Sequence, residues 1–343
     1  MSIDLHSLAE VVGVPWGALA LVAAVFAAFA YPGFAEGAPE ARCVHKGSHI
    51  LTSKDLVVEV MDPNHPDRYY AGVRFASVAA VLRVSMGRDQ FLFNPVGLDW
   101  RIGFHGGLAS ELNSKIPPPG FEEAQMGEGF VKIGVGVLKK NRETYTSLSP
   151  YEMINSAATT VTWEQSRAVF RQTCDGVRGY AYELTAAVKV EGKQVIVDWT
   201  LANTGAKPFE TDHFSHNLFL FNEQPVGPDY VLSFPYDFEA PDMGPEVRKE
   251  GREIHFFKRL SGAPYFHALY PKDYEGPNTV TARHLGNGLS IRCLTSIPGS
   301  GTWVFATRLH VCPEQYVEFA LEAGEKTSWR RTYAFAKETP AQR

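Results

Sequence analysis

Short segments that alternate apolar and polar residues follow one another from about residue 55 to residue 337, each closed by turn residues such as glycine, proline or aspartate. The turn signals recur about every ten residues, a spacing typical of an all-β sandwich or barrel. So many strands in one open sheet would leave long exposed edges. The sequence therefore predicts an all-β supersandwich of two large antiparallel sheets with a concave face.

The strand pattern is clearest in 56–62, 71–93, 130–140, 181–205, 289–297, 302–309 and 316–337. The segment 181–205 predicts a hairpin with its turn at Glu191-Gly192-Lys193. The best short candidate for a helix is 161–170. The proline-rich segment 116–129 is expected to be a loop over the site rather than a domain boundary.

An uncharged, alanine-rich run at 14–30 is typical of a signal-peptide core. The residues before it include two acids and no lysine or arginine, and about 17 residues is short for a membrane span. We expect a signal or anchor segment with its linker at 1–45, a single domain at 46–338 and a tail at 339–343. Export to the periplasm or outside the cell is favoured. The alternative is a cytoplasmic or N-terminally anchored protein, with membrane contact only through 14–30.

The composition narrows the function. The 343-residue chain has a net charge of −5 and no concentrated basic stretch, so nucleic acid is not an expected partner. It has no P-loop, no dinucleotide-binding glycine motif and no GxSxG sequence. The four cysteines lack zinc-ligand spacing, so a zinc site is not expected. Export would allow one or two disulfides.

Two histidines, His213 and His216, lie in the strand-like sequence ETDHFSHNLFLFN. Side chains alternate along a strand, so the two imidazoles should point to opposite faces unless a bulge at Phe214–Ser215 brings them together. Imidazole titrates near neutral pH and is the usual group for proton transfer. We expect one of the two to face a site, and the other to be held by Asp212 or a backbone carbonyl.

Four more residues are candidates for the site. Glu314, in VCPEQ, is placed either to act as a general base at a strand end or to lie in solvent at a turn. Arg74 lies in an apolar strand pattern and either donates to a substrate hydroxyl or faces outward. His105 is close to glycines that would let a ligand approach, and Asp229 lies in a Gly-Pro-Asp turn. Possible sugar-stacking rings, or else core residues, are Trp303, Phe266 and Tyr270.

Four segments together resemble the galactose mutarotase-like (aldose 1-epimerase-like) superfamily and occur in the expected order. They are YAGVRF (70–75), EGFVKIGVGVLKK (128–140), ANTGAKPFETDHFSHNLFLFN (202–222) and VCPEQYVEFALEAGEKTSWRRTYAF (311–335). The first resembles the strand with a sugar-contacting arginine, the third the strand with the acid histidine, and the fourth the closing strands with the glutamate base.

This resemblance implies a carbohydrate-binding isomerase that interconverts sugar anomers, with His216 as the acid and Glu314 as the base. The substrate ligands would be Arg74, His105, His213 and Asp229, and no metal or cofactor would take part. Two alternatives stay open on the same sandwich. One is a carbohydrate-binding protein without turnover. The other is a polysaccharide lyase or glycosidase, in which Arg74 could neutralise a uronate.

Overall fold

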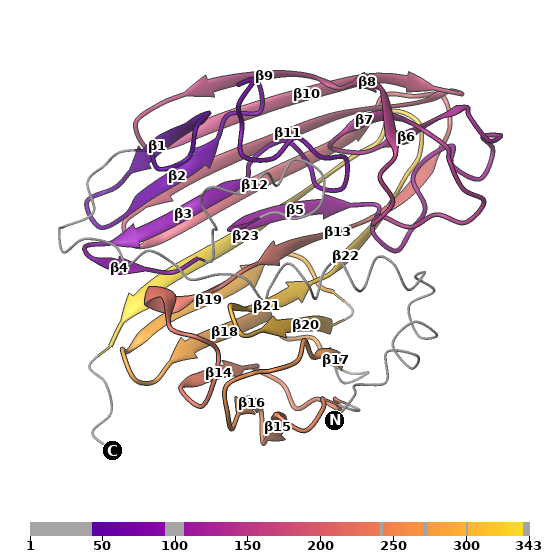
Figure 1. Ribbon diagram of the computed structural model, residues 1–343. Helices are drawn as coiled ribbons and strands as arrows, with labels where there is room; N and C mark the ends of the chain where they lie inside the picture. Colours follow the sequence, from indigo (N-terminus) through magenta and orange to yellow (C-terminus); the bar gives the residue numbers. More distant parts are fainter. Residues whose placement is uncertain (1–42, 93–105, 241–242, 270–273, 300, 339–343) are drawn as a thin grey trace. The chain divides into compact units, whose positions relative to one another are not determined.

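The computed structural model describes residues 43–92, 106–240, 243–269, 274–299 and 301–338, and these residues form strands joined by turns (Figure 1). They all belong to one compact unit, Pro39–Arg343. The predicted export or anchor run at 14–30 and the tail at 339–343 lie outside the described residues. Among the residues described, no helix is long and apolar enough to span a membrane.

Two large antiparallel sheets contain most of the strands. The seven-stranded sheet has the order β1-β2-β3-β5-β13-β22, with β4 paired to β3. Its strands are β1 (Ser48–Thr52), β2 (Val57–Met61), β3 (Val81–Met86), β4 (Asp89–Gln90), β5 (Leu108–Leu112), β13 (Phe209–Asn217) and β22 (Val317–Leu321).

The ten-stranded sheet has the order β15-β16-β14-β18-β19-β23-β12-β11-β10-β9. Its strands are β9 (Ala158–Trp163), β10 (Arg167–Val177), β11 (Tyr180–Glu191), β12 (Gln194–Asn203), β14 (Tyr230–Ser233), β15 (Val247–Glu250), β16 (Glu253–Phe256), β18 (Asn278–His284), β19 (Leu289–Thr295) and β23 (Lys326–Lys337).

Two smaller sheets complete the unit. One joins β17 (Tyr265–Leu269), β20 (Gly301–Thr307) and β21 (His310–Gln315), and the other joins β6 (Gly129–Lys132), β7 (Gly136–Lys139) and β8 (Glu152–Ser156). In the part of the chain that the structure describes, one 3-10 turn, η1 (Phe221–Glu223), follows β13.

The hydrophobic core lies between the two large sheets. In β10 and β23 buried side chains alternate with more exposed ones, so one face of the ten-stranded sheet packs inward. Its Trp199 and Trp329 stack with ring centroids 5.9 Å apart, and His213 of the seven-stranded sheet lies against both rings. Contacts of this kind, made from one sheet to the other, confirm the predicted supersandwich.

Several predicted elements are confirmed, and three differ. The hairpin at 181–205 forms as β11 and β12, with Gly192 at a φ of +52° in its turn. The segment 130–140 is two strands rather than one, because Gly134 turns the chain at a φ of +84°. The helix candidate 161–170 lies in β9 and β10. Residues 71–80 form bends before β3 and no strand.

Candidate active site

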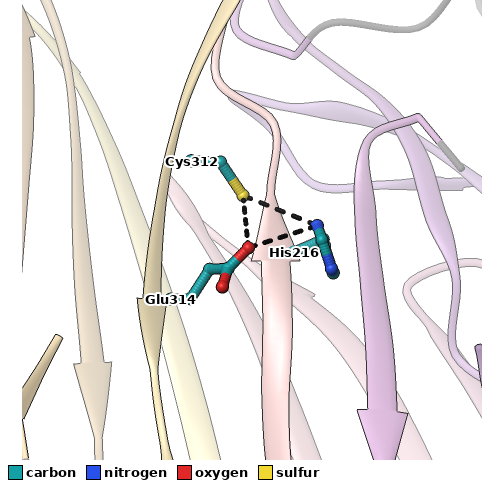
Figure 2. A group of neighbouring side chains, drawn as sticks. All are labelled: His216, Cys312 and Glu314. Atoms are coloured by element: carbon teal, nitrogen blue, oxygen red, sulfur yellow. Dashed lines mark hydrogen bonds and ion pairs between the residues drawn. The ribbon is translucent and has the colours of Figure 1, made fainter. Parts of the chain in front are cut away.

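Three side chains meet where β13 lies beside β21 (Figure 2). His216 comes from β13, and Cys312 and Glu314 come from β21. His216 Nδ1 is 3.3 Å from Glu314 Oε1 and 3.8 Å from Cys312 Sγ, and Cys312 Sγ is 3.5 Å from Glu314 Oε1. The His216 and Glu314 side chains are only 8% and 3% exposed, so their interaction is shielded from bulk water. We refer to these residues as the His216–Cys312–Glu314 cluster.

Strand periodicity and one asparagine bring the cluster together. Cys312 and Glu314 are two positions apart on β21, so both side chains point to the same face. Asn217 joins the two strands, since its Nδ2 donates to the carbonyl oxygen of Pro313 at 2.6 Å and its backbone N–H donates to Cys312 Sγ at 3.2 Å. The other amide atom, Asn217 Oδ1, accepts from the Tyr333 hydroxyl of the ten-stranded sheet at 3.0 Å.

Arg74 reaches the cluster from the bends before β3. The Tyr70 hydroxyl accepts the backbone N–H of Arg74 at 2.9 Å and thereby fixes this stretch of chain. The guanidinium donates from Nε to Glu111 Oε2 at 2.9 Å, and its Nη2 is 3.0 Å from His216 Nε2. The structure therefore brings together three of the predicted site residues, His216, Glu314 and Arg74.

The contact with Arg74 determines where His216 carries its proton. A guanidinium can only donate hydrogen bonds, so His216 Nε2 accepts from Arg74. The neutral ring then has its proton on Nδ1, which faces Glu314 Oε1. A proton donor and a carboxylate acceptor thus stand side by side in the resting site.

Burial and neighbouring charges set the pKa values of the carboxyl groups. Burial raises the pKa of Glu314, and nearby positive charge, including that of Arg74, offsets only part of that rise. Burial would also raise the pKa of Glu111, but neighbouring positive charge, first that of Arg74 and also that of Lys132, outweighs it and lowers the pKa to about 2. Glu111 is therefore a permanent anion at neutral pH, whereas Glu314 is protonated more easily than an ordinary glutamate.

Glu111 and Lys132 form a fully buried ion pair next to Arg74 and His216, and the sequence interpretation missed both residues. Lys132 Nζ donates to the carbonyl oxygens of Leu112 and Asn113 at 2.6 and 2.8 Å and lies 3.9 Å from Glu111 Oε1. Burial lowers the pKa of Lys132 to about 8. The sequence did hold a signal, because each charge stands alone in an apolar strand segment, LASEL or FVKIG.

His213 lies on the other face of β13. It is fully buried, and its Nδ1 is 3.1 Å from Trp329 Nε1 and 3.2 Å from Arg331 Nη2. The strand is regular here, so the two histidines are on opposite faces as predicted. The expected partner was different, since the Asp212 carboxylate accepts backbone N–H groups of the 114–116 loop instead. Its neighbours place His213 in the core between the sheets, away from His216.

The remaining predicted ligands are not placed at the cluster. His105 lies outside the described residues. Asp229 lies in the turn before β14 of the ten-stranded sheet, where its carbonyl oxygen accepts from Leu285 at 2.8 Å. The Asp229 turn thus belongs to a different sheet from β13 and β21.

Aromatic side chains flank Glu314. Trp303 stands directly opposite Glu314 in the β20–β21 pair, so the two side chains share a face. The ammonium group of Lys115 lies 4.2 Å from the Trp303 ring centroid and 3.8 Å from that of Tyr316. Of the other predicted stacking rings, Phe266 is buried in the core and Tyr270 lies outside the described residues.

The first residues of the proline-rich loop lie near the start of β13, whereas His216 lies near its end. Residues 116–120 line a cavity of about 480 Å³ together with Phe209, Glu210 and the end of β22. Glu210 and His216 are six positions apart on β13, which corresponds to about 20 Å along a strand. We base the candidate site on the cluster rather than on this cavity, because the ionisable groups in mutual contact are at the cluster.

Comparisons with known proteins identify the fold of this chain but not its activity. No family model matches the sequence, and no curated protein matches it. Solved structures do match, and the chain has the galactose mutarotase-like fold that its motifs resemble.

Three solved structures share this fold over most of the chain. The Slr1438 protein of Synechocystis has a TM-score of 0.56 at 11% identity, over 85% of this chain and 96% of that chain. An Escherichia coli protein, provisionally named an aldose 1-epimerase, has a TM-score of 0.56 at 12% identity, over 85% of this chain and 99% of that chain. The GalM/aldose epimerase homologue of C. elegans has a TM-score of 0.52 at 10% identity, over 85% of this chain and 100% of that chain.

Proposed function

We propose that this protein is a carbohydrate-active isomerase of the aldose 1-epimerase type. In this reaction a base takes the proton of the C1 hydroxyl while an acid protonates the ring oxygen, and the ring opens. Rotation about the C1–C2 bond and closure on the other face give the other anomer. The proton taken and the proton given balance over one turnover, so the chemistry requires one acid and one base with pKa values near the working pH.

The contact between His216 and Glu314 is the observation that carries this proposal. His216 Nδ1 and Glu314 Oε1 are 3.3 Å apart, so the two side chains are adjacent rather than separated by the width of a pyranose ring. Adjacency suits the chemistry better, because the C1 hydroxyl and the ring oxygen are bonded to the same carbon. A sugar that inserts between His216 Nδ1 and Glu314 Oε1 would present its hydroxyl to the carboxylate and its ring oxygen to the imidazole N–H.

The acid must be the imidazolium form, because a neutral ring that lost its Nδ1 proton would become an anion. Nε2 therefore has to take up a proton from solvent when Arg74 turns from His216 towards a substrate hydroxyl. Glu111 Oε2 is 3.8 Å from His216 Nε2 and is the acceptor placed to hold that proton. Trp303, opposite Glu314, offers a ring on which the apolar face of a sugar could stack.

Polarimetry on freshly dissolved α-anomers of a panel of aldoses tests the proposal. We expect the protein to accelerate mutarotation of at least one sugar. Glu314→Gln keeps the shape of the side chain but removes the base, and should slow turnover by about a hundredfold or more. Sugar binding without acceleration of any anomer would contradict the proposal and favour a binding protein, and absorbance from an unsaturated product would favour a lyase.

A further inference from the structure

The His216–Cys312–Glu314 cluster offers an imidazole nitrogen, a sulfur and a carboxylate oxygen, one from each residue. These are the three ligand types that Zn²⁺ takes in proteins. Mg²⁺ and Ca²⁺ prefer oxygen ligands only and fit this set poorly. Cys312 and Glu314 share one face of β21, and His216 approaches from β13, so the three donors converge from two rigid strands.

The spacing of the donor atoms matches a tetrahedral ion. With the usual zinc bond lengths, a tetrahedron separates nitrogen from oxygen by about 3.3 Å and sulfur from either by about 3.5 Å. The observed separations are 3.3 Å between His216 Nδ1 and Glu314 Oε1, 3.5 Å between Cys312 Sγ and Glu314 Oε1, and 3.8 Å between Cys312 Sγ and His216 Nδ1. All three edges are therefore within a few tenths of an ångström of the face of a zinc tetrahedron.

We propose that the His216–Cys312–Glu314 cluster binds one Zn²⁺ ion, with water as the fourth ligand, and that the bound ion inhibits the enzyme. The inhibition rests on the proposed function, because the ion would occupy the two atoms assigned there as acid and base. Metal binding itself does not rest on it.

The protons can be accounted for with solvent and groups already in the site. The Cys312 thiol gives its proton to solvent and binds as thiolate, and Glu314 binds as carboxylate, so the two ligand charges balance those of the ion. The imidazole stays neutral while its proton shifts from Nδ1 to Nε2, which requires Arg74 to turn away. Glu111 Oε2, 3.8 Å from Nε2, then becomes the acceptor that metal-bound histidines usually have on their second nitrogen.

Cobalt titration of the metal-free full-length protein tests the metal site without any activity assay. Tetrahedral Co²⁺ bound through sulfur gives visible d–d bands and a near-ultraviolet sulfur-to-cobalt charge-transfer band. We expect both to saturate at one ion per chain and to disappear when Zn²⁺ is added. Cys312→Ser should abolish the charge-transfer band and weaken Zn²⁺ binding at least about tenfold.

A matched cysteine variant controls for adventitious binding. Cys43 is exposed, and Cys43→Ser removes that thiol while leaving the cluster intact, so its spectrum should equal that of the wild type. If Cys312→Ser fails to fold, Glu314→Gln replaces it and should weaken Zn²⁺ binding by a similar factor. A wild-type protein without the charge-transfer band, or a band lost in Cys43→Ser and kept in Cys312→Ser, would overturn the metal site.

Turnover measured with and without Zn²⁺ separates the two proposals. Metal-free protein that catalyses mutarotation and stops at one bound Zn²⁺ would support both. Activity that persists with the site saturated would overturn the inhibition alone. Saturable Zn²⁺ binding by a protein that accelerates no sugar would instead contradict the proposed function and leave the metal site supported.

Discussion

His213 and His216 lie three residues apart on β13, and the two faces of that strand give their rings different surroundings. His213 is in the core, where burial and the charge of Arg331 push its pKa well below the usual histidine range. It therefore stays neutral and accepts at Nδ1 from its buried neighbours. His216 instead touches Arg74 and Glu314, two ionisable partners. The proposed proton transfer is therefore assigned to His216 by the face of the strand on which it lies, not by its residue type.

The raised pKa of Glu314 predicts the acid side of the pH–rate profile. A general base must be ionised, and burial favours the protonated form of this carboxyl group. Activity should therefore fall on acidification at a pH above the ordinary glutamate pKa of about 4.3. The pH dependence of kcat/KM measures this limb in the free enzyme. An acid limb at or below the ordinary glutamate value would show that another group is the base.

At the residue scale the sequence led to the proposed acid, the proposed base and the arginine beside them, but not to their neighbours. His216, Glu314 and Arg74 each lie in a segment that resembles the superfamily. The buried pair Glu111 and Lys132 belongs to the site only through pairing between distant strands, which local patterns do not encode. The same holds for the contact of Cys312 with His216, because these two residues are 96 positions apart in the sequence.

At the scale of elements, one buried carboxylate ties the start of the described chain to the seven-stranded sheet. Glu59 of β2 accepts the backbone N–H groups of Val44 and His45 at 2.9 and 2.7 Å and the hydroxyl of Ser48 at 2.6 Å, and it pairs with Arg83 of β3. Burial would raise its pKa, but the hydrogen bonds from His45 and Ser48 outweigh it and lower the pKa to about 2.

We predict that Glu59→Gln lowers the free energy of unfolding by about 2 to 3 kcal/mol at neutral pH, the range for hydrogen bonds to a charged group. Because the folded pKa is below the unfolded one, this contribution is complete above the unfolded pKa and is lost as the pH falls towards about 2. Urea denaturation of both proteins at neutral pH and at a pH of about 2 measures this difference in the free energy of unfolding. Glu210→Gln, at an exposed position of the same sheet, should change stability by under about 0.5 kcal/mol.

The strands that the sequence predicted best are those bounded by clear turn residues, such as β11, β12, β22 and β23. The errors have a common physical cause. Gly134 bends the chain inside an alternating segment, and residues 71–80 carry a strand-like pattern but are shaped by side-chain contacts such as that of the Tyr70 hydroxyl. In both places a local or tertiary constraint overrides the propensity that the pattern expresses.

At the scale of the whole molecule, the two large sheets define a fold that serves many functions, so the function has to be argued from the site. The likeness to solved structures is at 10–12% identity and covers 85% of the chain, which shows the arrangement of strands only. The proposed activity therefore depends on the contacts of the His216–Cys312–Glu314 cluster.

The cysteines predict how the whole domain responds to reductant. Export would have allowed disulfides, but all four cysteines are free, and Cys174, Cys293 and Cys312 are buried in separate strands. The sandwich is therefore held by its core and not by cross-links. We predict that the Tm is the same, within about 1 °C, with and without a thiol reductant. A Tm that falls on reduction would reveal a disulfide and contradict this arrangement.

The most direct test of the central claim compares His216→Ala with His213→Ala. Both proteins are first checked for folding by circular dichroism, and kcat is then measured on the sugar with the fastest mutarotation. His216→Ala should lower kcat by at least about a hundredfold, the scale for a lost general acid. His213→Ala should lower stability by about 2 kcal/mol or more through its core cavity and keep most of its turnover. Equal losses of kcat in two folded variants would contradict the account.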